Sequence, residues 1–270
     1  MPDDSPSLTA RLASRLRDSR FVLVFSGAGI STGSGIPDFR GPKGLWSKYQ
    51  PVYYDEFMSS HEARIRHWQF KLDGWREFRD ARPNPGHLAL FELDQMGHIH
   101  KIVTQNIDGL HQLAGHDDER VIEVHGTARK VECCSCNRLM GPDPVFDEFE
   151  KTGQPPLCEC GGFLKTATVS FGQPMPADKM QQAYQAAQSC DLVLSIGSTL
   201  EVEPAASVPR VAKECGAHYA ILNLGPTAHD HIADLRLEGD ASQILESAVE
   251  HLKRVSQEGQ RVEGSKSTRA

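Results

Sequence analysis

The sequence lacks any long apolar run, because no segment approaches the roughly 18 apolar residues of a membrane-spanning helix. Its first ten residues, MPDDSPSLTA, lack the basic start and apolar core of a secretory signal, so we expect a cytoplasmic protein. Positive charge is not in excess either: 29 lysines and arginines stand against 36 aspartates and glutamates, for a net charge of −7. We therefore expect no membrane partner and no direct nucleic-acid partner, although a local basic face is compatible with these totals.

The 270 residues suffice for one large domain, or for a large domain with a small satellite. Five short apolar runs have the composition of buried strands, at 21–25, 100–104, 120–124, 191–196 and 218–224. Helical patterns accompany them at about 8–18, 86–95, 176–188 and 241–254. This alternation predicts an α/β fold, a Rossmann-like parallel sheet with helices on both faces.

Two segments depart from that alternation. Residues 41–84 are rich in aromatic residues and arginine with helical patterning, and residues 131–169 hold a cysteine cluster among prolines and glycines. We interpret them as a helical module and a zinc-binding module that together form a small lobe. The Rossmann-like domain then comprises residues 8–40, 85–130 and 170–255, with flexible tails at 1–7 and 256–270.

A glycine-rich segment, GAGISTGSGIPDFR (27–40), follows the first predicted strand. Glycines let the backbone approach a diphosphate, and the N-terminus of a following helix attracts anions. Gly33 lies one residue beyond the third glycine position of the G-x-G-x-x-G fingerprint, so the segment is a poor dehydrogenase signature. The alternative to a phosphate-binding loop is an ordinary turn. Asp38 and Arg40 would form a surface ion pair, or else Arg40 would hold phosphate while Phe39 shields a reacting centre from water.

Polar side chains follow the next two predicted strands. Gln105, Asn106 and Asp108 come after the run 100–104, at the sheet edge where ligands of α/β proteins bind. They are suited to hydrogen-bond a ribose or a carboxamide, although such residues also form ordinary turns. His125 follows the run 120–124 and precedes a glycine, so it is a candidate general base, or alternatively a structural histidine.

Four cysteines have the spacing of a zinc ribbon. Cys133-x-x-Cys136 precedes Cys158-x-Cys160, and four thiolates suit a tetrahedral structural Zn²⁺ with no open position for catalysis. Cys134 leaves an alternative pairing with Cys136 open.

In their order along the chain, these motifs resemble the sirtuin family of NAD-dependent protein deacylases, in its bacterial type. The resemblance spans about residues 10–250 and rests on the segments 27–46, 104–111, 125–126, 171–172, 197–206 and 223–225 together with the four cysteines. It implies a cleft between a Rossmann-like domain and a small lobe, into which NAD and an acyl-lysine protein or peptide enter from opposite sides.

The resemblance also implies roles for individual residues. The catalytic residues would be His125, Asn106 and Gln105. NAD would be bound by Gly27, Ala28, Gly29, Thr32, Asp38, Phe39, Arg40, Gln105, Asn106, Asp108, Gly197, Ser198, Thr199, Asn223, Leu224, Gly225, Asp240 and Ala241. The substrate peptide would lie along Val169, Phe171, Gly172, Glu201 and Val202.

The implied reaction consumes NAD and yields nicotinamide, O-acyl-ADP-ribose and free lysine, with His125 as general base. Sirtuins that remove acidic acyl groups carry Tyr-x-x-Arg where this chain has Trp68-Gln-Phe-Lys71, which favours a neutral acyl group, acetyl above all. The competing readings are a protein ADP-ribosyltransferase, an NAD glycohydrolase, a desuccinylase-type deacylase, and a zinc-ribbon binding module with a vestigial nucleotide fold.

Overall fold

The computed structural model describes residues 7–37 and 50–267, with side-chain surroundings as far as Val255. A six-stranded, entirely parallel sheet forms its larger part. The strands are β1 (Val22–Ser26), β2 (Ile99–Thr104), β3 (Val121–Glu123), β7 (Leu192–Ile196), β8 (His218–Asn223) and β9 (Leu235–Glu238). Their spatial order, β3-β2-β1-β7-β8-β9, is the order 3-2-1-4-5-6 of a Rossmann sheet, which confirms the predicted fold class. The sequence reading did not anticipate β9.

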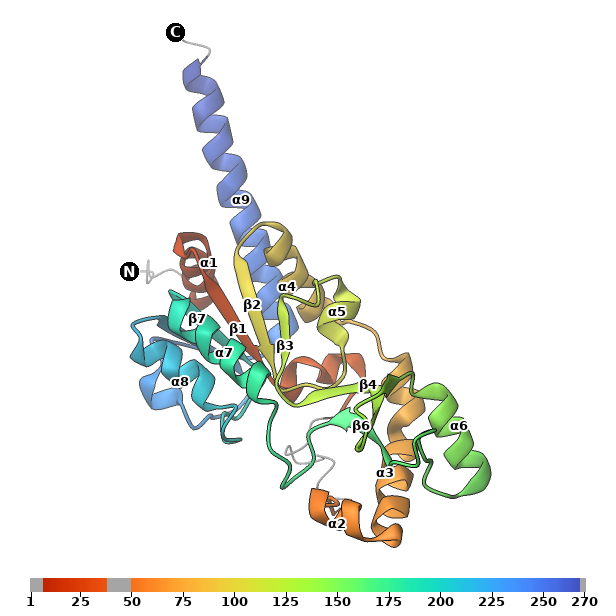
Figure 1. Cartoon of the computed structure of the whole chain (residues 1–270). Helices are drawn as coiled ribbons and strands as arrows, with labels where there is room; N and C mark the ends of the chain where they lie inside the picture. Colours follow the sequence, from red (N-terminus) through yellow and green to blue (C-terminus); the bar gives the residue numbers. More distant parts are fainter. Residues whose placement is uncertain (1–6, 38–49, 268–270) are drawn as a thin grey trace.

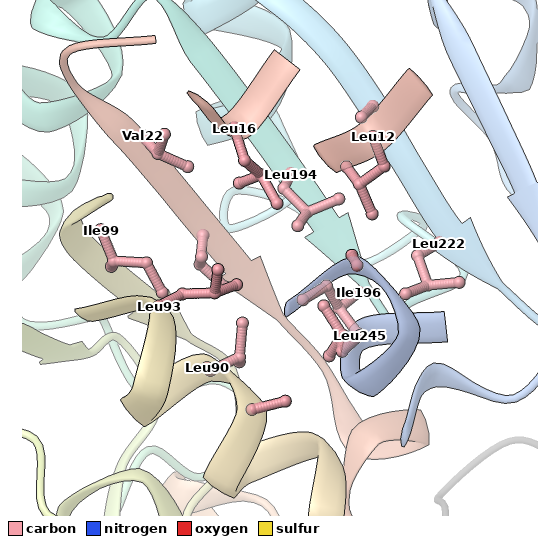
Figure 2. Close-up of a cluster of buried hydrophobic side chains, with 14 of the residues drawn as sticks. Leu12, Leu16, Val22, Leu90, Leu93, Ile99, Leu194, Ile196, Leu222 and Leu245 are labelled. Carbon is pink, nitrogen blue, oxygen red and sulfur yellow. The ribbon is translucent and has the colours of Figure 1, made fainter. Parts of the chain in front are cut away.

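Helices cover both faces of this sheet (Figure 1). On one face, α1 (Leu8–Asp18), α4 (Pro85–Gln95) and the first part of α9 (Ala241–Ser267) bury a leucine-rich cluster against the strands (Figure 2). On the other face, α7 (Ala177–Ser189) and α8 (Ser207–Glu214) cover a second cluster. Successive residues of β1 serve the two clusters in turn, Val22 and Val24 the first, Leu23 and Phe25 the second. A strand buried on both faces therefore reads as a continuous apolar run.

A second sheet, antiparallel and in the order β5-β4-β6, lies beside the first. It comprises β4 (Gly126–Cys133), β5 (Leu139–Met140) and β6 (Leu164–Thr168), accompanied by α6 (Asp143–Thr152), α2 (Tyr54–Ser59) and α3 (His61–Asp80). Trp68 and Trp75 of α3 share a buried cluster with Phe146 and Phe149 of α6 and Val131 of β4. The two interrupting segments thus have a hydrophobic core of their own. The small sheet begins before residue 131, where the sequence analysis had placed the start of the zinc-binding module.

Two expectations need correction. The chain after β1 forms two short 3₁₀ turns, η1 (Ala28–Ile30) and η2 (Thr32–Ser34), within the residues described up to Pro37, instead of an α-helix. Helix α9 continues to Ser267, beyond residue 254, where the last helix was expected to end. Residues 241–267 contain no proline and many strong helix formers, which allows the helix to continue.

The part of the chain that the structure describes holds no helix both long enough and apolar enough to cross a membrane. A short helix, α5 (Leu110–Ala114), and a 3₁₀ turn, η4 (Asp230–Ile232), complete the elements used below.

Candidate active site

One large cavity, of 1220 Å³, lies where the C-terminal ends of β1, β2, β7 and β8 face the second sheet and α3. It brings together most of the predicted site residues. Those that line it are Gly27, Ala28, Gly29, Thr32, Gln105, Asn106, His125, Val169, Phe171, Gly172, Gly197, Ser198, Thr199, Glu201, Val202, Asn223, Leu224, Gly225, Asp240 and Ala241. Asp38, Phe39 and Arg40 lie outside the described residues. Asp108 is described but does not line the cavity.

The glycines after β1 pack directly against the end of β7. Gly27 donates its N–H to Ile196 O at 2.9 Å, and Gly29 donates to Gly197 O at 2.8 Å. A Cβ on Gly27 would lie 2.7 Å from Gly197 O, and one on Gly197, whose φ is +62°, would lie 2.4 Å from Ile30 N. The two strand-end loops meet backbone to backbone, so these positions require glycine for packing as well as for ligand access.

Asn106 holds the glycine loop in place from β2. Its buried side-chain amide donates to Gly27 O at 3.1 Å and to Ser31 Oγ at 3.2 Å. The Ser31 hydroxyl donates in turn to Asp108 Oδ2 at 2.7 Å, while Asp108 Oδ1 accepts from Leu110 N at 2.9 Å. Burial raises the pKa of Asp108 in spite of these hydrogen bonds.

Asp108 therefore supports the loop from behind instead of facing the cavity. Ser31, which the sequence analysis did not single out, connects Asn106 to Asp108. Its hydroxyl within the glycine segment was the available signal.

Gln105, which follows β2, contacts residues at the ends of β1, β3 and β7. Its backbone N–H donates to Ser26 O at 2.9 Å and its side chain donates to Ser198 Oγ at 2.9 Å. Its carbonyl oxygen lies 3.0 Å from Nδ1 of His125. A carbonyl oxygen can only accept, so His125 carries a proton on Nδ1, and Nε2 has the lone pair of the neutral ring.

His125 stands where the chain leaves the large sheet and enters the small one. It lies between β3 and β4, and the next residue, Gly126, has φ +71°. A Cβ at Gly126 would lie 2.1 Å from Ala167 O, so only glycine allows β4 to turn so close to β6. Val169, just after β6, donates its N–H to His125 O at 2.9 Å. The small sheet thus fixes the backbone of the histidine, while Gln105 from the large sheet holds its ring.

The residues predicted to contact a peptide form the outer rim of the cavity. Phe171 is 40% exposed, its ring centroid lies 5.9 Å from that of Tyr53, and its carbonyl accepts from Tyr54 N at 2.9 Å. Glu201 and Val202 line the same cavity from the loop after β7.

The opposite end of the cavity is built by loops after β7, β8 and β9. Asn223 donates through its side chain to Gly225 O at 2.9 Å. Ala228 N donates to Thr199 O at 2.9 Å, which ties the loop after β8 to the loop after β7. Asp240 caps α9, because its Oδ1 accepts from Gln243 N at 3.0 Å.

A further wing of the cavity extends along α3, which the sequence reading did not assign. His67 and Lys71 line it together with Trp75 and Phe146. Burial, and then the nearby Lys165 ammonium, lower the pKa of Lys71 to about 8. The helical pattern of 41–84 does not show that these two basic groups face a cavity, and only the family motif at residues 68–71 pointed to Lys71.

The four predicted zinc ligands converge. The Sγ atoms of Cys133, Cys136, Cys158 and Cys160 lie within 4.8 Å of one another, and the pairs Cys133–Cys160 and Cys136–Cys158 are 3.5 and 3.8 Å apart. Tetrahedral Zn²⁺ with Zn–S bonds of about 2.3 Å requires sulfur separations of about 3.8 Å, so the site fits structural zinc. Cys134 is not part of this group, which resolves the alternative pairing.

Of the cysteines outside this group, Cys190 is buried and Cys215 is exposed. His229 Nδ1 lies 3.0 Å from the Tyr219 hydroxyl. Among the described residues, the cysteine tetrad is the only group suited to hold a metal ion.

A Rossmann-ordered sheet, a large cavity across its strand ends and a four-thiolate module beside it define a two-lobed dinucleotide-binding protein with a structural zinc site. A family model described as the Sir2 family matches residues 27–204. The chain belongs to the Sir2 family, which confirms the resemblance inferred from its motifs.

Individual relatives agree with this family assignment. An NAD-dependent protein deacetylase of Rhodopseudomonas palustris is 45% identical over 245 residues, covering 89% of this chain and 97% of that protein. A solved structure of Sir2 with p53 peptide and NAD⁺ has a TM-score of 0.78 at 35% identity, covering 92% of this chain and 97% of the other. Sir2Af2 bound to a myristoylated histone peptide has a TM-score of 0.75 at 33% identity, covering 93% and 98%.

Proposed function

We propose that the chain is an NAD-dependent protein lysine deacylase, acting foremost on acetyl-lysine. One observation carries the proposal: the glycine loop, His125, and Phe171 with Val202 all line a single cavity. NAD and an acyl-lysine peptide can therefore meet at the histidine from opposite ends. The overall reaction takes acyl-lysine, NAD⁺ and water to lysine, nicotinamide and O-acyl-ADP-ribose.

His125 acts as the general base in this proposal. Its Nδ1 proton is engaged by Gln105 O, so Nε2 accepts a proton from a ribose hydroxyl, which then attacks the acyl carbon. The Gln105 carbonyl orients the ring and favours the imidazolium that forms, because an oxygen acceptor at Nδ1–H stabilises positive charge on the ring.

Different groups of strand-end residues would bind different parts of the dinucleotide. Gly27, Ala28, Gly29 and Thr32, with Arg40, would serve the diphosphate, and Phe39 would cover the nicotinamide ribose. Asn106 and Gln105 serve that ribose and the carboxamide, with Asp108 and Ser31 holding Asn106 in position. The adenosine half would lie against the residues of the loops after β7, β8 and β9. These are Gly197, Ser198, Thr199, Asn223, Leu224, Gly225, Asp240 and Ala241.

The acylated peptide would lie as a strand between Val169–Gly172 and Glu201–Val202. The zinc site holds the small lobe together and takes no part in catalysis, because four thiolates leave no coordination position open. A cytoplasmic location and the absence of membrane and nucleic-acid partners complete the proposal, and cell fractionation would test the location.

The deciding experiment is nicotinamide release that depends on an acetyl-lysine peptide. We expect release with peptide and NAD together, and mass spectrometry should find O-acetyl-ADP-ribose. A modified protein would instead indicate an ADP-ribosyltransferase, free ADP-ribose a glycohydrolase, and no release a binding module. Acetyl- and succinyl-lysine peptides are to be compared side by side, and faster desuccinylation would overturn the preference for a neutral acyl group.

His125→Ala and His125→Tyr test the assigned base. Loss of a positioned base costs roughly 10²–10⁴ in rate. His61→Ala is the matched control, because His61 is exposed at the start of α3. Near-normal turnover in a folded His125 variant would contradict its role.

A further inference from the structure

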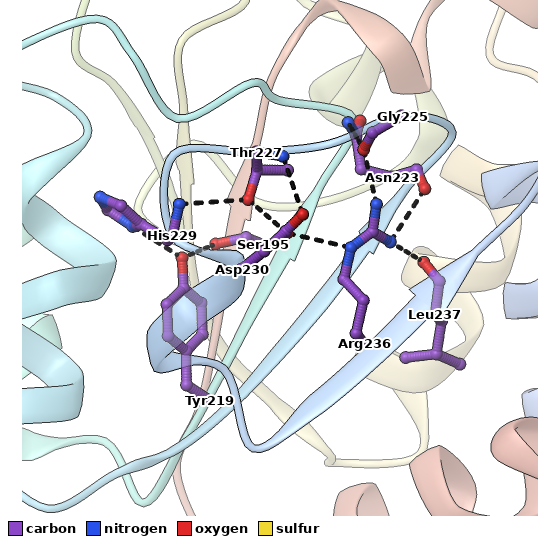
Figure 3. Close-up of polar contacts among 9 residues, drawn as sticks. All are labelled: Ser195, Tyr219, Asn223, Gly225, Thr227, His229, Asp230, Arg236 and Leu237. Carbon is purple, nitrogen blue, oxygen red and sulfur yellow. Dashed lines mark hydrogen bonds and ion pairs between the residues drawn. The ribbon is translucent and has the colours of Figure 1, made fainter.

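The guanidinium of Arg236, on β9, lies against the loop that follows β8 (Figure 3). Its Nη1 donates to Asn223 O at 3.0 Å and also to Leu237 O, and its Nη2 donates to Gly225 O at 2.5 Å. Its Nε donates to Asp230 Oδ1 at 3.0 Å. The side chain is only 24% exposed. One side chain therefore joins the two ends of the loop formed by residues 223–230.

Asp230 completes this connection. Its Oδ2 accepts from Thr227 N at 3.1 Å and its Oδ1 accepts from Thr227 Oγ1 at 2.7 Å (Figure 3). Burial alone would raise the pKa of Asp230, but the hydrogen bonds from Thr227 and the positive charge of Arg236 outweigh it and lower the pKa below its ordinary value. The carboxylate is thus charged at neutral pH, and its hydrogen bonds are charge-assisted.

The loop that Arg236 holds is a wall of the cavity. Asn223, Leu224 and Gly225 line it. The same loop also holds its neighbour, because Ala228 N donates to Thr199 O at 2.9 Å. Arg236 itself does not line the cavity, so it cannot act by touching a ligand there.

Loss of the guanidinium would leave the Asn223 and Gly225 carbonyls without its hydrogen bonds, and Asp230 without its counter-charge. A loop freed in this way must be reordered whenever a ligand binds against it, which weakens binding without altering the chemistry at His125.

We propose that Arg236 is a positioning residue for the adenosine half of NAD, acting through residues 223–230 and Thr199. The inference rests on the proposed function in one respect, the placement of adenosine against these loops. It does not depend on the identity of the acyl substrate or of the catalytic base.

The test compares two ligands in Arg236→Gln, Arg236→Lys and Asp230→Asn. ADP-ribose contains the adenosine half, and nicotinamide mononucleotide lacks it. Isothermal titration should show the Kd of ADP-ribose rising about tenfold in Arg236→Gln, in line with the loss of hydrogen bonds to a charged group. Arg236→Lys should recover part of the affinity, because one ammonium can reach a carbonyl but cannot reproduce all the hydrogen bonds of the planar guanidinium. The affinity for nicotinamide mononucleotide should stay within about twofold.

Arg76→Gln is the control, since Arg76 forms an exposed ion pair with Glu150 on the small lobe and does not line the cavity. It should leave both ligands unaffected. In steady-state assays, Arg236→Gln should raise KM for NAD while kcat at saturating NAD and KM for the peptide stay near wild type.

An unchanged Kd for ADP-ribose would overturn the inference. An equal loss of affinity for both ligands would also overturn it, because it would indicate general destabilisation of the protein. If Arg236→Gln fails to fold, Arg236→Lys and Asp230→Asn decide by the same comparison. Wild-type protein that binds ADP-ribose but deacylates no peptide would refute the proposed function alone, because the ligand comparison still tests Arg236.

Discussion

Replacing Lys71 with methionine should stabilise the protein at pH 7. The Lys71 ammonium on α3 is partly buried, lies 5.6 Å from the Phe70 ring and makes no ion pair with any described residue. Burial, and then the Lys165 ammonium, lower its pKa from 10.5 to about 8. The folded state therefore binds this proton more weakly than the unfolded chain does, and the charged amine is a cost to folding.

The size and sign of the effect follow from that shift. One pKa unit corresponds to about 1.4 kcal/mol, so the shift sets an upper limit of roughly 3 kcal/mol on the gain in unfolding free energy. At pH 7 the amine is protonated in both states and the cost is present in full. Between pH 8 and 10.5 the folded state releases the proton first, so wild-type stability gains and the advantage of the variant shrinks. Methionine keeps the length of the side chain and packs well against aromatic rings.

Denaturant unfolding at pH 7 and at about pH 10 measures the difference directly. Lys130→Met is the control, because Lys130 is exposed on β4 and its replacement should change little at either pH. A Lys71→Met protein no more stable than wild type at pH 7, or one whose advantage persists undiminished at high pH, would refute the reasoning.

Three further changes probe the fold and the cavity. Gly197→Ala should abolish ADP-ribose binding in titrations and lower Tm, because its Cβ would lie 2.4 Å from Ile30 N. Gly216→Ala, also at positive φ but with nothing within 4 Å of its Cβ, should keep binding ADP-ribose. Tight binding by Gly197→Ala would contradict the packing argument. Elemental analysis should find zinc in wild type and in Cys134→Ser but not in Cys158→Ser. Equal zinc content in the two variants would exclude the assigned tetrad. Trp68→Ala should cost about 3–5 kcal/mol in denaturant unfolding, because the fully buried ring contacts Phe146 and Phe149, and a loss below about 1 kcal/mol would show that the small lobe does not depend on this core.

The parallel sheet could be predicted because its strands are buried on both faces. FVLVF is short and continuously apolar, and DLVLSI is mostly so, a pattern typical of strands buried on both faces. Strand β9 escaped for the opposite reason. It lies at the sheet edge and alternates Leu235 and Leu237 with Arg236 and Glu238, so its hydrophobic signal is half as dense.

The cavity could be predicted where the residues follow strand ends, because parallel topology brings all C-terminal ends to one edge. His125 and Asn106 are of this kind. Residues placed by tertiary packing gave a weaker signal. Lys71 lies on a helix of the small lobe, and only its match to a motif position of the family pointed to it. Ser31 supports the site through a hydrogen bond to Asp108, 77 positions further along the chain. Local patterns cannot report which helix face will be turned toward a distant sheet.

The connection at His125 explains why a zinc module accompanies a Rossmann sheet in this protein. The histidine is the last residue before β4, and Val169, the first residue after β6, holds its carbonyl. Strands β4 and β6 pair with one another, and Cys133 ends β4 within the zinc site. The position of the imidazole over the cavity thus depends on both sheets: the Gln105 carbonyl sets its ring from the large one, and the β4–β6 pair sets its backbone from the small one. A zinc site closed to substrate would therefore still help to position His125, because it holds the far ends of the two strands that lead away from it.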